Sequence, residues 1–211
     1  MRGLLKQIRI GPVTWTILAV CVAIETASQL SDHGLIEFRN LRQLGYYYGG
    51  FWPGLLGTWR PNYAAQPFLM FVTYGFLHLG ASHLLINMSL LILLGRMVSD
   101  RIGQWRFAAV YAISLLGGAC AFGFLTSGLV PMVGASGALF GLSGAIVGWE
   151  FLDRRRNKEP LLPVIAFIAG FGALNLVHWW AMNGQLAWQT HLGGFLAGFV
   201  AALYFDRPRA A

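Results

Sequence analysis

The distribution of charge along the chain limits its possible folds more than any other feature. Three long stretches contain no Asp, Glu, Lys or Arg: residues 61–95, 107–149 and 160–205, which are 35, 43 and 46 residues long. A helix that crosses a bilayer needs about 20 consecutive, mostly apolar residues. The first stretch can therefore hold one membrane-spanning helix, and each of the other two can hold two helices joined by a tight turn.

The overall composition agrees with a membrane protein. The 211 residues are 56% hydrophobic and only 11% charged, whereas a typical soluble domain is about 25% charged. This composition excludes a secreted disulfide scaffold, a nucleic-acid-binding domain and a cytosolic enzyme. We interpret the net charge of +7 as a signature of membrane topology, so the expected partner is the lipid bilayer and not a nucleic acid.

The apolar segments predict an all-α polytopic protein with six membrane helices in a single domain, residues 1–211. The first segment follows a basic start but contains Glu25 and lacks a small-residue cleavage site, so we expect a retained helix and not a signal peptide. The six helices are expected at about 13–30, 80–96, 106–126, 134–150, 161–182 and 188–205.

The basic residues orient these helices, because Lys and Arg are more frequent in cytoplasmic loops. Twelve of the 15 Lys and Arg residues fall at the two termini and in the turns after the second and fourth helices. The other three, Arg39, Arg42 and Arg60, fall in a long outer loop at about 31–79. Both termini are therefore expected to be cytoplasmic. The outer loop is rich in Tyr and Trp, which favour the membrane boundary, so we expect it to lie on or partly in the outer leaflet.

Four polar residues fall at comparable depth, near the outer ends of three helices. His83 and Asn87 are one turn apart on one helix face, Ser136 begins the fourth helix, and His191 begins the sixth. Each of them, taken singly, is more simply explained by packing or by an interhelical hydrogen bond. Polar groups inside a membrane are costly, however, and indicate function by default. Their coincidence in depth favours a functional site.

Glycines predict how these residues come together. The fourth helix carries Gly137 and Gly141, and the sixth carries Gly194 and Gly198, so each has small residues four positions apart. Such spacing lets helix backbones approach closely in membranes. If the two helices pack through these glycines, Ser136 and His191 meet at their outer ends.

The combination suggests acyl transfer. A serine hydroxyl becomes a good nucleophile when a base within hydrogen-bonding reach takes its proton, and histidine suits that task near neutral pH. Donors for the developing oxyanion could come from the Ser136 backbone N–H, which is unpaired at a helix start, and from His83 and Asn87. We find no suitable acid for a triad, since Glu25 is better explained as a structural group. A Ser–His dyad, without a metal ion or cofactor, is the simplest assignment.

These residues lie in motifs that resemble the rhomboid family of intramembrane serine proteases. The similar segments are residues 73–78 (TYGFLH), 83–88 (HLLINM), 134–141 (GASGALFG) and 191–198 (HLGGFLAG).

The resemblance implies a six-helix rhomboid-like bundle that cleaves transmembrane protein substrates near the outer membrane boundary. It assigns Ser136 as nucleophile, His191 as general base and acid, and His83, Asn87 and the Ser136 N–H to the oxyanion site. Gly134 belongs to the serine motif and is expected to support the site with the packing glycines. We expect a multi-pass protein of the bacterial inner membrane. The substrate, its cleavage motif and the oligomeric state stay open.

One departure and two alternatives accompany this interpretation. Rhomboids often carry a Trp-Arg pair shortly before the Thr that matches Thr73, but here Trp59 and Arg60 lie about ten residues too early, so the first loop is expected to be built differently. The first alternative is a non-catalytic relative that binds membrane helices as a chaperone or adaptor. The second is a small transporter with broken helices. The first alternative is weakened because such relatives usually lack the serine or the histidine.

Overall fold

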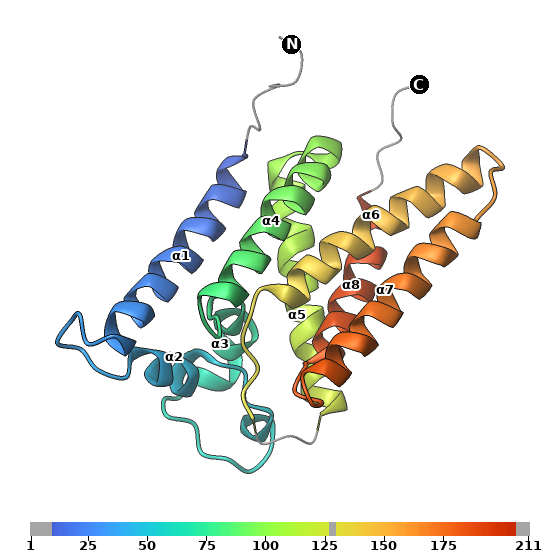
Figure 1. Ribbon diagram of the computed structural model, residues 1–211. Coiled ribbons are helices and arrows are strands. Elements are labelled where there is room, and N and C mark those ends of the chain that lie inside the picture. Colours follow the sequence, from blue (N-terminus) through green and yellow to red (C-terminus); the bar gives the residue numbers. More distant parts are fainter. Residues whose placement is uncertain (1–9, 127–129, 206–211) are drawn as a thin grey trace, which may run out of the picture.

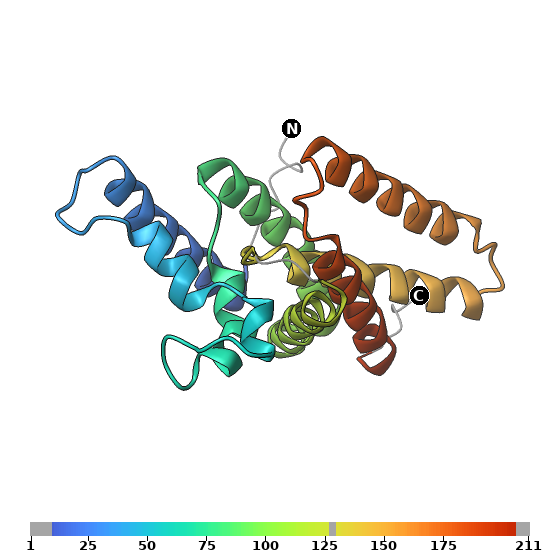
Figure 2. The same ribbon diagram turned by 90° about the horizontal axis from the view of Figure 1, so that it is seen from below.

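The computed structural model describes residues 10–126 and 130–205, and within these ranges the chain is helical. Six long helices run alongside one another, while two short helices gather at one end of the bundle (Figure 1). Seen from below, α5 lies between a group formed by α1 to α4 and a group formed by α6 to α8 (Figure 2). The long helices are α1 (Pro12–Asp32), α4 (Ala81–Ile102), α5 (Gln104–Leu125), α6 (Ser136–Arg156), α7 (Leu162–Ala181) and α8 (Trp188–Tyr204).

Four of these helices, α1, α4, α5 and α7, are long and apolar enough to cross a membrane. Helix α6 is rich in glycine and carries Glu150 and Asp153 near its end, and α8, with 17 residues, is the shortest of the six long helices. Most of the first four turns of α6 is buried inside the protein, so its side chains face other helices and need not be apolar. In α7, by contrast, only Val164 is buried, and the rest of that helix is strongly apolar.

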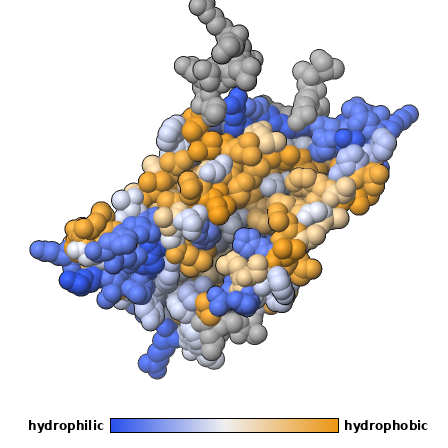
Figure 3. Space-filling view, viewed as in Figure 1, coloured by the Kyte–Doolittle hydropathy of each residue, from blue (hydrophilic) through white to orange (hydrophobic). Residues whose placement is uncertain are grey.

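The outer surface has the pattern expected of such a protein. In Figure 3 hydrophobic side chains cover the middle of the face shown, and hydrophilic side chains gather toward its ends. The start of α1 and the end of α8 lie at the same end of the bundle, opposite to α2 and α3 (Figure 1). The chain is therefore an integral, multi-pass membrane protein.

The packing between α6 and α8 depends on glycine. A Cβ atom added at Gly194 would overlap the carbonyl oxygen of Gly137, and one added at Gly198 would overlap that of Gly141. At Gly144 the obstacle is the carbonyl oxygen of Phe195. The two backbones therefore touch directly at three points along α6, in the way that small residues allow in membrane helices.

The segment expected as a long outer loop, 31–79, contains ordered helical structure. It holds α2 (Leu41–Gly49) and α3 (Gln66–Thr73), together with two 3₁₀ turns at Pro53–Leu56 and Tyr74–Phe76. Short helices of this kind do not stand out as membrane spans: α2 is polar, and α3, although apolar, has only eight residues.

A buried ion pair attaches this segment to α1. Both terminal nitrogens of the Arg42 guanidinium donate to the carboxylate of Glu25 at 2.9 Å, and its Nε donates to Asp32 at 2.6 Å. The same side chain donates to the carbonyl oxygen of His78 at 2.9 Å, as does the hydroxyl of Tyr46. These interactions raise the pKa of Arg42, and the hydrogen bond to Glu25 is the largest cause. Since Glu25 is 3% exposed, Arg42 supplies the charge that this carboxylate requires.

Two helices extend beyond their predicted ends on the opposite side of the bundle. Helix α4 continues past residue 96 to Ile102, and α6 continues past residue 150 to Arg156. Arg101 and Asp153 form an ion pair with N–O distances of 2.8 and 3.1 Å between the two extensions, and Arg154 pairs with Glu150 one turn earlier in α6. Ion pairs stabilise these turns, and hydrophobicity gives no indication of them.

Candidate active site

Ser136 lies at the first position of α6, and an extended segment carries the chain to it. Phe51 and Met132 exchange backbone hydrogen bonds of 3.0 and 2.9 Å, and the N–H of Gly134 donates to the carbonyl of Tyr74 at 2.9 Å. This segment runs from the α2–α3 end up into the bundle, so α6 begins inside the protein (Figure 1). The backbone N–H groups in the first turn of α6, including that of Ser136, have no acceptor within the helix.

The structure brings His191 to Ser136. The Nε2 atom of His191, in the first turn of α8, lies 2.9 Å from the Ser136 Oγ. The imidazole is 6% exposed, and the ring of Phe140 stacks on it with a centroid distance of 3.9 Å and an interplanar angle of 10°. Phe140 is one turn beyond Ser136 on α6, so one helix provides both the hydroxyl and the surface against which the imidazole packs.

The other ring nitrogen of His191 has a partner that sequence reasoning missed. Its Nδ1 lies 2.8 Å from Oδ1 of Asn175, on α7. A third group beside the dyad was expected to be a carboxylate, whereas Asn175 carries an amide. Its position inside a strongly apolar helix was the available signal, because polar groups in membrane helices indicate function or pairing.

His83 is close to the same place and has a defined orientation. An ideal Cβ at Gly134 would lie 2.8 Å from Cε1 and 3.2 Å from Nε2 of His83, and 3.8 Å from the Ser136 Oγ. The imidazole edge and the hydroxyl therefore border the same space, on the side of Gly134 where a side chain would project. Gly134 has a φ of +130°. The backbone N–H of Leu79 donates to His83 Nδ1 at 3.2 Å. Because Nδ1 accepts, Nε2 carries the proton of the neutral ring and is a donor.

Asn87 is buried one turn further along α4. Its Nδ2 donates to the backbone carbonyl of His83 at 2.8 Å, while its Oδ1 has no hydrogen-bond partner among the described residues. One amide hydrogen is thus engaged within α4, and the second is available to another acceptor. Ser143, by contrast, donates to the carbonyl of Leu139 in its own helix at 3.2 Å.

This arrangement can support acyl transfer. It combines a hydroxyl with a base at hydrogen-bonding distance, and beside the hydroxyl lie the His83 Nε2–H and the free amide groups at the start of α6. In the described parts of the chain, no group of three or more His, Cys, Asp or Glu side chains is placed to hold a metal ion.

The packed membrane helices and the buried serine–histidine pair define an integral membrane protein with a candidate nucleophile and base. Comparison with known proteins defines its family. The model of the Rhomboid domain matches residues 65–208. The chain belongs to the rhomboid family, which confirms the resemblance seen in its motifs.

Individual relatives agree with the family model. RHOMBOID-like protein 2 of Arabidopsis thaliana is 39% identical over 128 residues, covering 58% of this chain and 38% of that protein. RHOMBOID-like protein 6, mitochondrial, of the same plant is 33% identical over 131 residues, covering 61% of this chain and 40% of the relative. Rhomboid protease GluP of Bacillus subtilis is 31% identical over 139 residues, covering 64% of this chain and 25% of that protein. The chain thus spans about two fifths or less of the length of these relatives.

Proposed function

We propose that the protein is an intramembrane serine endopeptidase that cleaves membrane-anchored protein substrates near the outer membrane boundary. The observation that carries the proposal is the 2.9 Å contact between His191 Nε2 and Ser136 Oγ, inside a protein of the rhomboid family. The relative from Bacillus subtilis is named a rhomboid protease, which supports the same activity at the level of the family.

The proposed reaction uses Ser136 and His191 as a dyad. As the Ser136 Oγ attacks the scissile carbonyl carbon, His191 Nε2 accepts the hydroxyl proton, and the carbonyl oxygen becomes an oxyanion. His191 then donates this proton to the leaving amine, the peptide C–N bond breaks, and an acyl-enzyme forms. In the second half of the reaction His191 takes a proton from a water molecule as the water oxygen attacks the acyl carbon. The ester C–Oγ bond then breaks, and His191 returns the proton to the Ser136 Oγ, which restores the hydroxyl.

The oxyanion is proposed to lie in the space beside Gly134. The His83 Nε2–H borders this space, the Ser136 N–H is at the start of α6, and Asn87 has one amide hydrogen available. Donors of this kind accelerate acyl transfer because they are fixed before charge develops. Here the neighbouring elements fix them: Leu79 orients the His83 ring, and the backbone of α4 holds Asn87.

The topology proposed for this activity has six membrane crossings within a single domain, with both termini cytoplasmic. The start of α1 and the end of α8 lie at the same end of the bundle, which supports an even number of crossings (Figure 1). The excess of Lys and Arg at the termini and in the turns after the second and fourth membrane helices supports a cytoplasmic orientation for that end. The relatives come from a plant and a bacterium, and one is named mitochondrial. They therefore do not single out the bacterial inner membrane that we expected from the sequence.

The proposal is tested by incubating the purified full chain, in liposomes, with a panel of proteins that each contain one transmembrane segment. Any cut is mapped by mass spectrometry. We expect cleavage near the outer end of at least one segment, loss of cleavage in Ser136→Ala and His191→Ala, and retained cleavage in the matched control Ser143→Ala. If Ser136→Ala still cleaves and Ser143→Ala does not, the nucleophile is assigned wrongly. Binding of the segments without cleavage would instead favour the non-catalytic alternative.

A further inference from the structure

The imidazole of His191 is held from three directions, by three different side chains. Ser136 lies at Nε2 and Asn175 at Nδ1, at 2.9 and 2.8 Å, and Phe140 covers one ring face. A neutral imidazole carries one proton, and its two nitrogens then have opposite roles. To accept the proton of Ser136, Nε2 must be free of hydrogen, so Nδ1 must carry it.

The amide of Asn175 can select this tautomer. Its Oδ1 is an acceptor and cannot donate, so a 2.8 Å contact between Oδ1 and Nδ1 requires the hydrogen to be on Nδ1. The tautomer of a catalytic histidine is set in this way by whichever group its other nitrogen meets.

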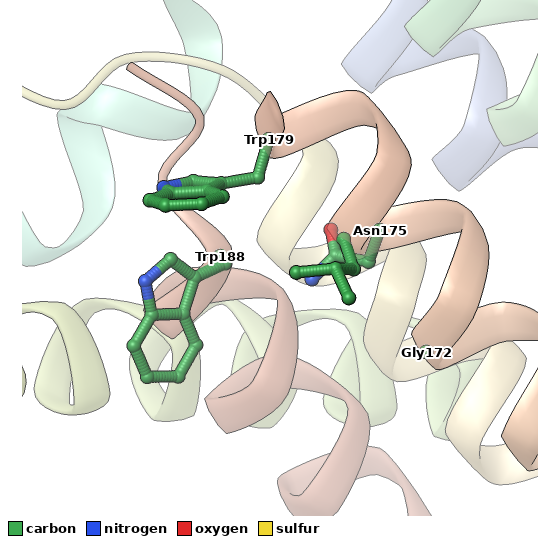
Figure 4. A pocket seen from close by; sticks show the side chains of 5 residues that line it. Gly172, Asn175, Trp179 and Trp188 are labelled. Carbon is green, nitrogen blue, oxygen red and sulfur yellow. The ribbon is translucent and has the colours of Figure 1, made fainter. Parts of the chain in front are cut away.

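Asn175 comes from a helix that contributes little other polar contact to the bundle. Val164 is the single buried residue of α7, and the aromatic contacts of Phe171 with Phe140 and Phe195 are apolar. In Figure 4 Asn175 and Trp179 of α7 stand opposite Trp188 at the start of α8, and they line a pocket of about 240 Å³. The Asn175 amide thus lies where α7 and α8 meet, one helical turn before Trp179.

We propose that Asn175 is a positioning residue for the Ser136–His191 dyad. It holds His191 in the tautomer with hydrogen on Nδ1 and fixes the rotation of the ring, and it does not itself contact substrate. The kinetic part of this inference rests on the proposed function, whereas the tautomer is a property of the resting protein and is tested without turnover.

Histidine-selective ¹⁵N NMR of the full chain in detergent micelles tests the tautomer directly. The chain has five histidines, and the His191 signals are identified by their loss in His191→Gln. We expect a protonated, pyrrole-type Nδ1 and an unprotonated, pyridine-type Nε2 for His191. In Asn175→Leu, which keeps the size of the side chain but removes the acceptor, we expect a mixture of both tautomers. A hydrogen on Nε2 in the native protein, or an unchanged spectrum in Asn175→Leu, would overturn the inference.

Kinetics provides the second test. Removing the tautomer-fixing aspartate of a serine protease triad lowers kcat by about 10⁴-fold. Asn175 has no charge with which to stabilise the imidazolium, so we expect a smaller loss, about 10- to 100-fold in kcat for Asn175→Leu, with KM changed by less than about twofold. Asn175→Asp retains an acceptor oxygen and should keep kcat within about threefold of the native value.

The matched control is Leu174→Ala, the adjacent residue of α7, whose side chain is 63% exposed. It should leave kcat unchanged, which separates the hydrogen bond from a general loosening of α7. Equal losses in Asn175→Leu and Asn175→Asp, or native kcat in Asn175→Leu, would refute the positioning role. If the native protein shows the expected tautomer but cleaves no substrate, the proposed function fails and the orientation by Asn175 stands.

Discussion

Substitution of Gly198 tests whether direct backbone contact between α6 and α8 sets the geometry of the candidate site. In Gly198→Ala, the new Cβ would overlap the carbonyl oxygen of Gly141 and would lie 2.7 Å from its Cα. Ordinary contacts of a Cβ begin at about 3.4 Å, so the helices must separate by about 1 Å. The obstacle is backbone, which cannot rotate away, and the cost of such overpacking is about 1–3 kcal/mol.

This displacement should be visible in the reaction although Gly198 touches no reacting group. Ser136 is on α6 and His191 on α8, and their contact is 2.9 Å, so separating the helices moves Nε2 out of hydrogen-bonding reach. A misplacement of about 1 Å costs up to 10²-fold in rate. We therefore expect kcat of Gly198→Ala to fall by about 10²-fold, with a lower melting temperature, both measured in the same detergent with one transmembrane substrate.

Gly170→Ala is the matched control. Gly170 lies in the middle of α7, where an added Cβ meets nothing within 4 Å, and glycine is less favourable than alanine in a helix by about 1 kcal/mol. The control should therefore keep its kcat and lose no stability. If Gly198→Ala also keeps native kcat and melting temperature, α6 and α8 do not depend on this contact, and the explanation for the Ser136–His191 distance is wrong.

Three further perturbations address the surroundings of the dyad. Asn87→Ala and His83→Ala should each lower kcat more than they raise KM, by about 10²–10³-fold for a principal oxyanion donor; unchanged kcat in both would leave them only structural roles. Arg42→Met should lower the melting temperature more than the double variant Arg42→Met/Glu25→Met, because the single change leaves a buried carboxylate without its partner; equal losses would argue against a buried charge on Glu25. Burial, followed by the charge of the neighbouring His83, lowers the pKa of His78 from 6.5 to about 4. Between these two pH values the unfolded chain binds more protons than the folded one, so the stability of the folded protein falls as the pH drops from 6.5 to 4. His78→Gln should therefore lose less melting temperature than the native protein between pH 7 and pH 4.5, and an identical loss would exclude His78 as a contributor.

The parts of this fold that follow from a single physical requirement are predictable from the sequence. Charge-free stretches predict the long helices because a bilayer excludes charge. The spacing of Gly137, Gly141, Gly194 and Gly198 predicts close packing of two particular helices, and the structure places their backbones in contact. Once these helices are aligned, the positions of Ser136 and His191 at the ends of their segments follow, which explains why a pair 55 residues apart could be anticipated.

Features that depend on tertiary pairing were not predictable in the same way. The turns of α6 beyond residue 150 form because Asp153 meets Arg101 of α4, and neither residue gives a hydrophobic signal. Helices α2 and α3 lie in a segment that composition identifies only as a long loop. The pairing of Glu25 with Arg42 requires knowing that α2 folds back against α1, although a buried acid does predict that some cation must approach it.

The central claim is that Ser136 is a nucleophile activated by His191. The most direct measurement is the rate of labelling by a fluorophosphonate probe, which reacts with activated serines, followed by mass spectrometric identification of the labelled residue. The account predicts one modified residue, Ser136, in the native protein and in Ser143→Ala, with labelling abolished in His191→Ala. Absence of labelling in the native protein, modification of a different serine, or labelling of Ser136 that persists at the native rate in His191→Ala would contradict it.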